Sequence, residues 1–397
     1  MRKTKSLTNN LDWPLLIGFL TLICFGLMTI YSVAFNDESP SIFSFSEKYG
    51  KQIMWICLSL FLGVTVFLID SDIYKKFALP VYFVTLGLLV LVLFMPPING
   101  ARAWLGIGSM GIQPAEFAKT STALLLARYI GGLNLKQLNS KKVFIALIII
   151  VIPMALILLQ PDAGTFVVFT AFFFVLYREG LTFDPFILNF INLIPKVKYK
   201  STWIGSHFIP ILFVLVFLSL LTLLLGHKNI GIIPGVPLYG SLGIIVSLLL
   251  ISIAGILFVQ KFGTKRELKK VRLIIILSFI VASFTSFIVE YSFVQIADHQ
   301  KDRIELFLGL KEDPNGKDYN RNRAMAAVGS GGFIGKGYKN ASVSSVKTNH
   351  VPESETDFIF CPYAEEWGFL GSIVLLFLYL FVIIRILIIA ERQRSSF

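Results

Sequence analysis

The chain has 397 residues, of which 55% are hydrophobic and 15% are charged, and its mean hydropathy is +0.75. This composition leaves too little polar surface to cover a water-soluble protein of that length, so it predicts an integral membrane protein. The net charge of +12 does not indicate nucleic-acid binding, because the Lys and Arg residues lie in short runs between apolar stretches, where they act as topology signals.

In chain order, the apolar stretches predict an all-α fold, a polytopic integral membrane helix bundle in which residues 1–397 form a single membrane domain. Each stretch is long enough, or nearly so, to cross about 30 Å of hydrocarbon as a helix. The ten predicted helices lie near residues 12–34, 51–70, 76–96, 113–131, 143–160, 164–178, 206–226, 237–260, 271–297 and 367–390.

The distribution of basic residues predicts how these helices are oriented. If the N-terminus is cytoplasmic, the loops that alternate to the inside carry the basic clusters, and the short outside loops carry few. The positive-inside rule then places the one long loop, residues 298–366, outside the cytoplasm. Residues 180–205 mix aromatic, apolar and basic side chains, which is typical of a segment that lies in the headgroup layer.

Two places inside the apolar stretches carry ionisable groups, which are costly in a membrane unless they are paired or hydrated. Glu116 and Lys119 are three residues apart, so they share a helix face and can neutralise each other. The pair either locks two helices together or belongs to a functional site. Asp162 follows Pro161 and precedes Gly164, a pattern that favours capping of the next helix, with substrate or metal contact as the alternative.

The long loop carries the densest chemistry. Its stretch GSGGFIGKG, residues 329–337, is rich in glycine. The backbone N–H groups of such a stretch could approach a phosphate closely. Further on, Glu353, Glu355 and Asp357 precede an apolar run, and Glu365 and Glu366 follow about two turns later. Clustered carboxylates at the mouth of a helix suit a general base or a divalent-metal site, and the alternative is a hydrated loop end with helix-capping acids.

Four stretches of the chain resemble one known family, the SEDS proteins (shape, elongation, division and sporulation), and within it the RodA branch more than the FtsW branch. They are NGARAWLGIGSMGIQPAEFAK, QPDAGT, DPNGKDYNRNRAMAAVGSGGFIGKG and PESETDFIFCPYAEEWGFLG. The resemblance implies a peptidoglycan glycosyltransferase that extends glycan strands from lipid II in cell-wall elongation, at the outer face of the bacterial cytoplasmic (inner) membrane.

The resemblance also implies roles for particular residues. The family's essential Asp, in a TDFIF-like motif, falls on Asp357, the expected catalytic carboxylate. The expected substrate-binding residues are Arg102, Trp104, Glu116, Lys119, Asp162, Gly331, Gly332, Lys336 and Glu353. The family is thought to need a divalent cation, Mg²⁺ or Mn²⁺, although the sequence shows no ligand set for it. The expected partners are a class B penicillin-binding protein and other membrane proteins of the elongation complex.

The sequence departs from the family pattern in two ways. The segments near 206–260 add about two apolar crossings, and the chain ends where the family normally continues with two more helices, so we expect either a truncated form or one that does without them. Two other functions stay open from the sequence. One is a lipid II flippase, which the intramembrane charges would suit; the other is a non-catalytic scaffold for a penicillin-binding protein.

Overall fold

The computed structural model describes most of the chain. The described residues are 11–35, 43, 45, 47–97, 102–107, 110–133, 139–181, 185, 207–225, 240–262, 265–295, 298–311, 319–345, 350–393, 395 and 397. The segment 180–205, expected in the headgroup layer, therefore lies almost wholly outside them.

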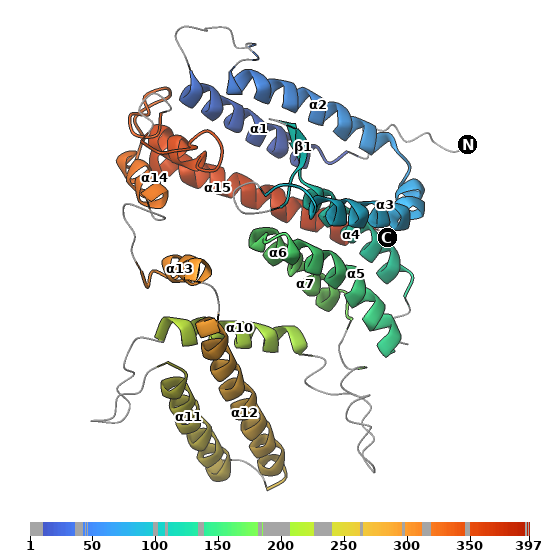
Figure 1. The fold of residues 1–397 in the computed structure, drawn as a ribbon, viewed down its shortest axis with the longest axis vertical. Helices are drawn as coiled ribbons and strands as arrows, with labels where there is room; N and C mark the ends of the chain where they lie inside the picture. The colour runs from blue at the N-terminus through green and yellow to red at the C-terminus, as the bar shows by residue number, and fades with distance from the viewer. Residues whose placement is uncertain are drawn as a thin grey trace. The chain divides into compact units, whose positions relative to one another are not determined.

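The structure confirms the predicted all-α membrane fold (Figure 1). The described helices are α1 Trp13–Ala34, α2 Lys48–Leu68, α3 Ser71–Val92, α4 Pro114–Gly131, α5 Ser140–Leu159, α6 Ala163–Phe169, α7 Ala171–Arg178, α10 Phe208–Leu225, α11 Gly240–Phe262, α12 Lys265–Gln295, α13 Asp298–Phe307, α14 Tyr319–Ser330 and α15 Phe360–Arg392. Two short antiparallel strands, β1 Leu105–Ile107 and β2 Met110–Ile112, form a hairpin before α4.

Seven helices in the described ranges are long and apolar enough to cross a membrane: α1, α2, α3, α5, α11, α12 and α15. Two apolar stretches are shorter: Gly164–Arg178 covers α6 and α7, and Pro210–Leu225 covers most of α10. In lipid a spanning segment must satisfy its own backbone hydrogen bonds, which is why these apolar runs form helices.

The chain divides into two compact units. The first consists of Met1–Asp70 and Lys311–Ser395, and the second consists of Ser71–Leu310 with Ser396–Phe397. In the first unit, α1 packs against both α2 and α15, and α14 packs against α15. In the second unit, α3 packs on α4, α5 packs on α4 and α6, and α12 packs on α10 and α11.

The core of the second unit lies among α3 to α7 and contains polar contacts as well as apolar ones. Leu89, Ile150 and Phe169 are among its fully buried side chains. Thr85 on α3 and Ser121 on α4 share a hydrogen bond of 2.7 Å between their hydroxyls. Small hydroxyl residues let neighbouring helices approach closely while their polar groups stay paired, which suits helix packing in lipid.

The last helix differs from its predicted form. The sequence predicts a helix near 367–390 preceded by loop, whereas α15 begins at Phe360 and is interrupted at Gly368, where φ is 65° and ψ is −163°. Residues 361–366 are buried, including both acidic ones. The hydropathy pattern missed this turn of helix because Glu365 and Glu366 are charged, and charge normally indicates exposure.

Candidate active site

Asp357 lies in a series of turns, residues 351–359, that lead into α15. The apolar side of this segment packs on α14: Val351 is buried together with Ala324, Ala327 and Cys361, and Phe358 packs against the same cluster. Figure 1 shows α14 beside the start of α15. The segment is therefore held on a small apolar core on both sides of the candidate carboxylate, at Val351 and at Phe358.

Local hydrogen bonds fix the backbone around Asp357. Glu353 has a positive φ of 54°, and its carbonyl oxygen accepts hydrogen bonds from the backbone N–H groups of Thr356 (3.1 Å) and Phe358 (3.2 Å). The Asp357 side chain is exposed, and no hydrogen bond or ion pair to it is found among the described residues. A carboxylate that is exposed on a constrained backbone is available to take a proton from a bound molecule.

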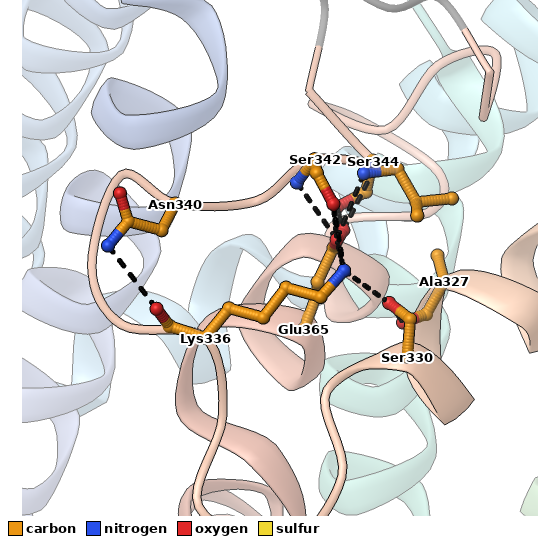
Figure 2. A network of polar contacts seen from close by, with 8 residues as sticks. Ala327, Ser330, Lys336, Asn340, Ser342, Ser344 and Glu365 are labelled. Atoms are coloured by element: carbon orange, nitrogen blue, oxygen red, sulfur yellow. Dashed lines mark hydrogen bonds and ion pairs between the residues drawn. The ribbon is translucent and has the colours of Figure 1, made fainter.

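Lys336 forms the centre of a polar network between the glycine-rich stretch and α15 (Figure 2). Its ammonium lies 2.6 Å from Glu365 Oε1 and donates to the hydroxyls of Ser330 (2.9 Å) and Ser342 (2.8 Å). An ammonium has three protons, so these contacts use all of them within the fold. The role of Lys336 as a substrate contact stays a prediction, while its structural role is visible.

Glu365 is fully buried and receives hydrogen bonds from a second side as well. The backbone N–H groups of Ser342 and Val343 donate to Oε1 at 2.9 Å, and that of Ser344 donates to Oε2 at 2.9 Å. Figure 2 shows Ser342 and Ser344 directed at the Glu365 carboxylate. A buried charge is tolerated when a counter-ion and hydrogen bonds surround it, and this carboxylate has both.

Glu366 is also buried, but its surroundings differ. Its Oε1 accepts hydrogen bonds from the Ser32 hydroxyl of α1 and from the backbone N–H of Lys339, the latter at 3.1 Å. Its Oε2 has no hydrogen-bond partner in the part of the chain that the structure describes. The side chain thus joins α1, the loop after α14 and α15 within the first unit.

The glycine-rich stretch is shaped by close packing against α15. A Cβ on Gly331 would lie 2.3 Å from the backbone oxygen of Ala364, and one on Gly335 would lie 2.2 Å from that of Glu366. The backbone N–H groups of Lys336 and Gly337 donate to the carbonyls of residues 365 and 366, at 3.0 and 2.9 Å. These contacts account for Gly331 and Gly335 without a phosphate, and the role of Gly331 and Gly332 in binding substrate stays a prediction.

In the second unit, the polar residues of α4 pair as their spacing predicts. Lys119 Nζ lies 2.8 Å from the Glu116 carboxylate, and both side chains are partly exposed. Asp162 caps α6, because its Oδ1 accepts from the backbone N–H of Thr165 at 3.0 Å. Its Oδ2 accepts from Gln113 Nε2, also at 3.0 Å, so this carboxylate links α6 to the start of α4.

Arg102 and Trp104 lie just before the hairpin of β1 and β2. The backbone N–H of Arg102 donates to the carbonyl of Gln160 at 3.3 Å, and its Nη1 donates to the carbonyl of Leu93 at 3.1 Å. The Trp104 ring lies over Gly111 of β2, where a Cβ would be 3.0 Å from the ring. Both side chains are partly exposed and so remain accessible.

The expected divalent cation has no preformed ligand set in the described ranges, which contain no group of three His, Cys, Asp or Glu side chains that could hold a metal ion. Near Asp357, Glu355 is already paired with Lys48, and Glu365 is saturated by Lys336 and backbone donors. The described residues do not make a cation site by themselves.

The structure groups the candidate residues into two sets, each placed within its own unit. Asp357, Glu353, Lys336 and the glycines belong to the first unit, and Arg102, Trp104, Glu116, Lys119 and Asp162 belong to the second. Sequence reasoning did not identify Ser342 and Ser344, which hold Glu365, or Ser32, which holds Glu366. A run of serines after a glycine-rich stretch was the available signal, although it is a weak one.

The fold and composition define a multi-pass membrane protein of helices, with an exposed carboxylate on a constrained turn before its last described helix. A family model described as cell cycle protein, FtsW/RodA/SpoVE, matches residues 13–204 and 241–397. The chain therefore belongs to this family. The family model leaves residues 205–240 unmatched, and these contain α10 and end at the first residue of α11. One described helix is therefore additional to the family pattern, whereas the sequence predicted about two additional crossings.

Curated relatives match over nearly the whole chain. The peptidoglycan glycosyltransferase RodA of Treponema pallidum is 29% identical, over 94% of this chain and 80% of the relative. The peptidoglycan glycosyltransferase MrdB of Escherichia coli K12 is 26% identical, over 98% and 78%. A solved structure described as "Structural coordination of polymerization and crosslinking by a peptidoglycan synthase complex" aligns with a TM-score of 0.57 at 21% identity, covering 97% of this chain and 80% of that one. That likeness supports the fold.

Proposed function

We propose that this protein is a peptidoglycan glycosyltransferase that polymerises lipid II into glycan strands at the outer face of the bacterial cytoplasmic membrane, during cell-wall elongation. The observation that carries the proposal is Asp357. It is an exposed carboxylate on a turn that is fixed by packing and hydrogen bonds, in a chain whose family includes relatives named as peptidoglycan glycosyltransferases.

In the proposed reaction Asp357 acts as the general base. It accepts the proton of the acceptor sugar's hydroxyl while that oxygen forms a bond to the anomeric carbon of the donor. The bond from that carbon to the diphosphate breaks on the opposite face, and the lipid diphosphate leaves with the bonding electron pair. A lipid-tethered substrate stays in the bilayer, which suits a base located beside the end of a membrane helix.

The departing diphosphate gathers negative charge, which cationic side chains would stabilise in the transition state. The second unit carries two candidates for this role, the guanidinium of Arg102 and the ammonium of Lys119. Because Glu116 already lies 2.8 Å from Lys119, we propose that Glu116 keeps this ammonium oriented and offsets its charge until the diphosphate arrives.

Two parts of the proposal concern the setting of the enzyme. We propose that its N-terminus is cytoplasmic, which puts the Asp357 turn outside, in agreement with the basic clusters of the sequence. We also propose that a class B penicillin-binding protein is its partner and supplies crosslinking. The aligned structure of a peptidoglycan synthase complex supports this pairing.

The decisive experiment is polymerisation of lipid II by the purified protein in detergent, with the products separated by length. The parent protein is expected to yield long glycan strands, and Asp357→Asn, which keeps the size of the side chain and removes its basicity, is expected to lower the rate by at least about 100-fold. Membrane insertion and thermal stability should be unchanged, because the side chain is exposed.

Two outcomes would contradict the proposal. If the Asp357→Asn protein still makes strands at close to the parental rate, Asp357 is not the base. If the parent protein yields no strands while its penicillin-binding protein partner alone polymerises lipid II, the chain is a scaffold. A flippase would likewise give no strands in detergent, where there is no membrane to cross.

A further inference from the structure

Lys48, the first residue of α2, reaches the turn segment that carries Asp357. Its ammonium forms an ion pair with Glu355, two residues before Asp357. The two members are unequally exposed: the Lys48 side chain is 57% exposed and the Glu355 side chain 10%. The carboxylate is therefore largely removed from water, and the partly hydrated ammonium supplies its counter-charge.

This asymmetry makes the pair more consequential than an ordinary surface ion pair. Exposed pairs contribute little because water solvates both members well. A mostly buried carboxylate that loses its counter-ion must instead turn outward to regain solvent. Because Glu355 and Asp357 lie on the same short run of turns, a backbone movement that exposes Glu355 displaces Asp357 as well.

Among the described residues, the other contacts of the turn segment lie within it or on its α14 side. The hydrogen bonds to the Glu353 carbonyl are internal to the segment, and Val351 and Phe358 hold its apolar side against α14. Arg323 of α14 fixes the start of the segment by donating from Nη1 to the carbonyl of His350 at 2.8 Å. The contact with Lys48 joins the middle of the segment to a different helix, α2.

We propose that Lys48 is a positioning residue for the glycosyl transfer: through Glu355 it holds the turn that presents Asp357 to the acceptor hydroxyl. The inference rests on the proposed function, since it assigns Lys48 a part in that same reaction. A base must lie within about 3 Å of the proton it takes, and a displacement of about 1 Å can cost 100-fold in rate. The expected effect therefore falls on turnover and leaves the KM for lipid II nearly unchanged.

The test is a charge-reversal cycle on the full-length purified protein with lipid II as substrate. Lys48→Glu and Glu355→Lys are each expected to lower kcat about tenfold, because each places like charges in contact. The double variant, which restores the pair with its charges exchanged, is expected to recover most of the lost rate. Lys48→Arg is expected to retain at least about half of the parental kcat, because it keeps the charge and reach.

Lys51→Glu serves as the matched control. Lys51 lies three residues further along α2, is exposed, and makes no side-chain ion pair within the described part of the chain. Its reversal changes the net charge as Lys48→Glu does, and kcat should stay within about twofold of the parent.

The outcomes separate this inference from the proposed function. If the parent protein polymerises lipid II but the single reversals leave kcat unchanged, or the double variant is no faster than the slower single, Lys48 does not position the turn. If the parent makes no strands, the proposed function itself fails. Should the reversals prevent purification, Lys48→Met and Glu355→Gln replace them, and equal kcat in the parent and both neutral variants overturns the inference.

Discussion

Glu365 illustrates how a single buried charge can organise a loop. Its two oxygens accept hydrogen bonds from the Lys336 ammonium and from the backbone N–H groups of three successive residues, 342–344. Such a concave array of N–H groups binds an anion in the same way that nests bind phosphate. Here the anion is a side chain of the protein itself, so the array holds the loop after the glycine-rich stretch onto α15.

Glu365→Gln should therefore destabilise the protein although it preserves the shape of the side chain. The Lys336 ammonium would lose its carboxylate, and an amide N–H₂ group would face backbone donors. We expect a loss of about 3 kcal/mol, in the range found when one partner of a buried ion pair is removed. The buried thiol of Cys361 can report unfolding through its reaction with a fluorescent maleimide during heating.

The measurement needs a background in which Cys24 and Cys57, both exposed, are replaced by Ala. A Glu365→Gln protein that melts at the parental temperature would show that the network adds nothing to stability.

At the scale of elements, the junction of the glycine-rich stretch with α15 depends on backbone contact. Gly331→Ala places a Cβ at 2.3 Å from the Ala364 carbonyl oxygen, a distance that the two backbones can relieve only by separating. We expect destabilisation of about 2 kcal/mol or more, as in other overpacked cores. The same thermal assay measures it.

Gly329→Ala is the control for this substitution. Gly329 lies in α14, two residues earlier, and a Cβ there would meet no atom within 4 Å. Alanine is the better helix former, so this change should be neutral or raise the melting temperature slightly. Equal effects of the two substitutions would refute the packing explanation for Gly331.

The junction of α1 with α15 depends on an ion pair between Asp12 and Arg385. Asp12 caps α1 by accepting from the Leu15 N–H at 3.0 Å, and Arg385 Nε donates to its carboxylate at 2.9 Å. The hydrogen bond from Arg385 holds the pKa of Asp12 below its usual range. The stabilisation that Asp12 contributes is therefore complete above the pKa of about 4 that an Asp has in the unfolded chain. It is lost as the pH falls through the lower pKa that Asp12 has in the folded state.

Asp12→Asn removes this acid-sensitive contribution. On acidification from about pH 6 to about pH 3, the melting temperature of the parent should fall further than that of the Asp12→Asn variant, which starts lower. Other carboxylates titrate in both proteins, so the difference between the two curves isolates Asp12. Parallel curves would show that the pair does not stabilise the α1 and α15 junction.

At the scale of the whole molecule, the sequence predicts the fold well because hydropathy and backbone satisfaction in lipid allow few alternatives. Helix α1 starts at Trp13, one residue from its predicted start, and the spacing of Glu116 and Lys119 correctly predicts their ion pair. The contacts that link distant parts of the chain escaped prediction. Glu365 and Lys336 are 29 residues apart, and Asp12 and Arg385 are 373 apart, separations at which no local pattern operates.

The candidate site was predictable only in part, because tertiary packing also shapes it. Asp357 is identified by its motif, but the constrained turn around it depends on Val351, Phe358 and Lys48, whose contacts come from tertiary packing. Glycine in the stretch after α14 suggested phosphate binding from the sequence, since close backbone approach is what both phosphate binding and helix packing require. The structure shows that the glycine-rich stretch packs closely on α15. Composition alone could not distinguish such packing from phosphate binding.

Membrane orientation gives the last prediction, because the proposed reaction requires the Asp357 turn to face the outside. In a background without Cys24, Cys57 and Cys361, Asp357→Cys should react with a membrane-impermeant maleimide in intact spheroplasts, since residue 357 is exposed. Lys141→Cys, at the start of α5 in a predicted cytoplasmic loop, should react only after the cells are opened. Labelling of residue 141 in intact cells, with residue 357 protected until lysis, would invert the topology and remove the carboxylate from the side where the glycan strand is made.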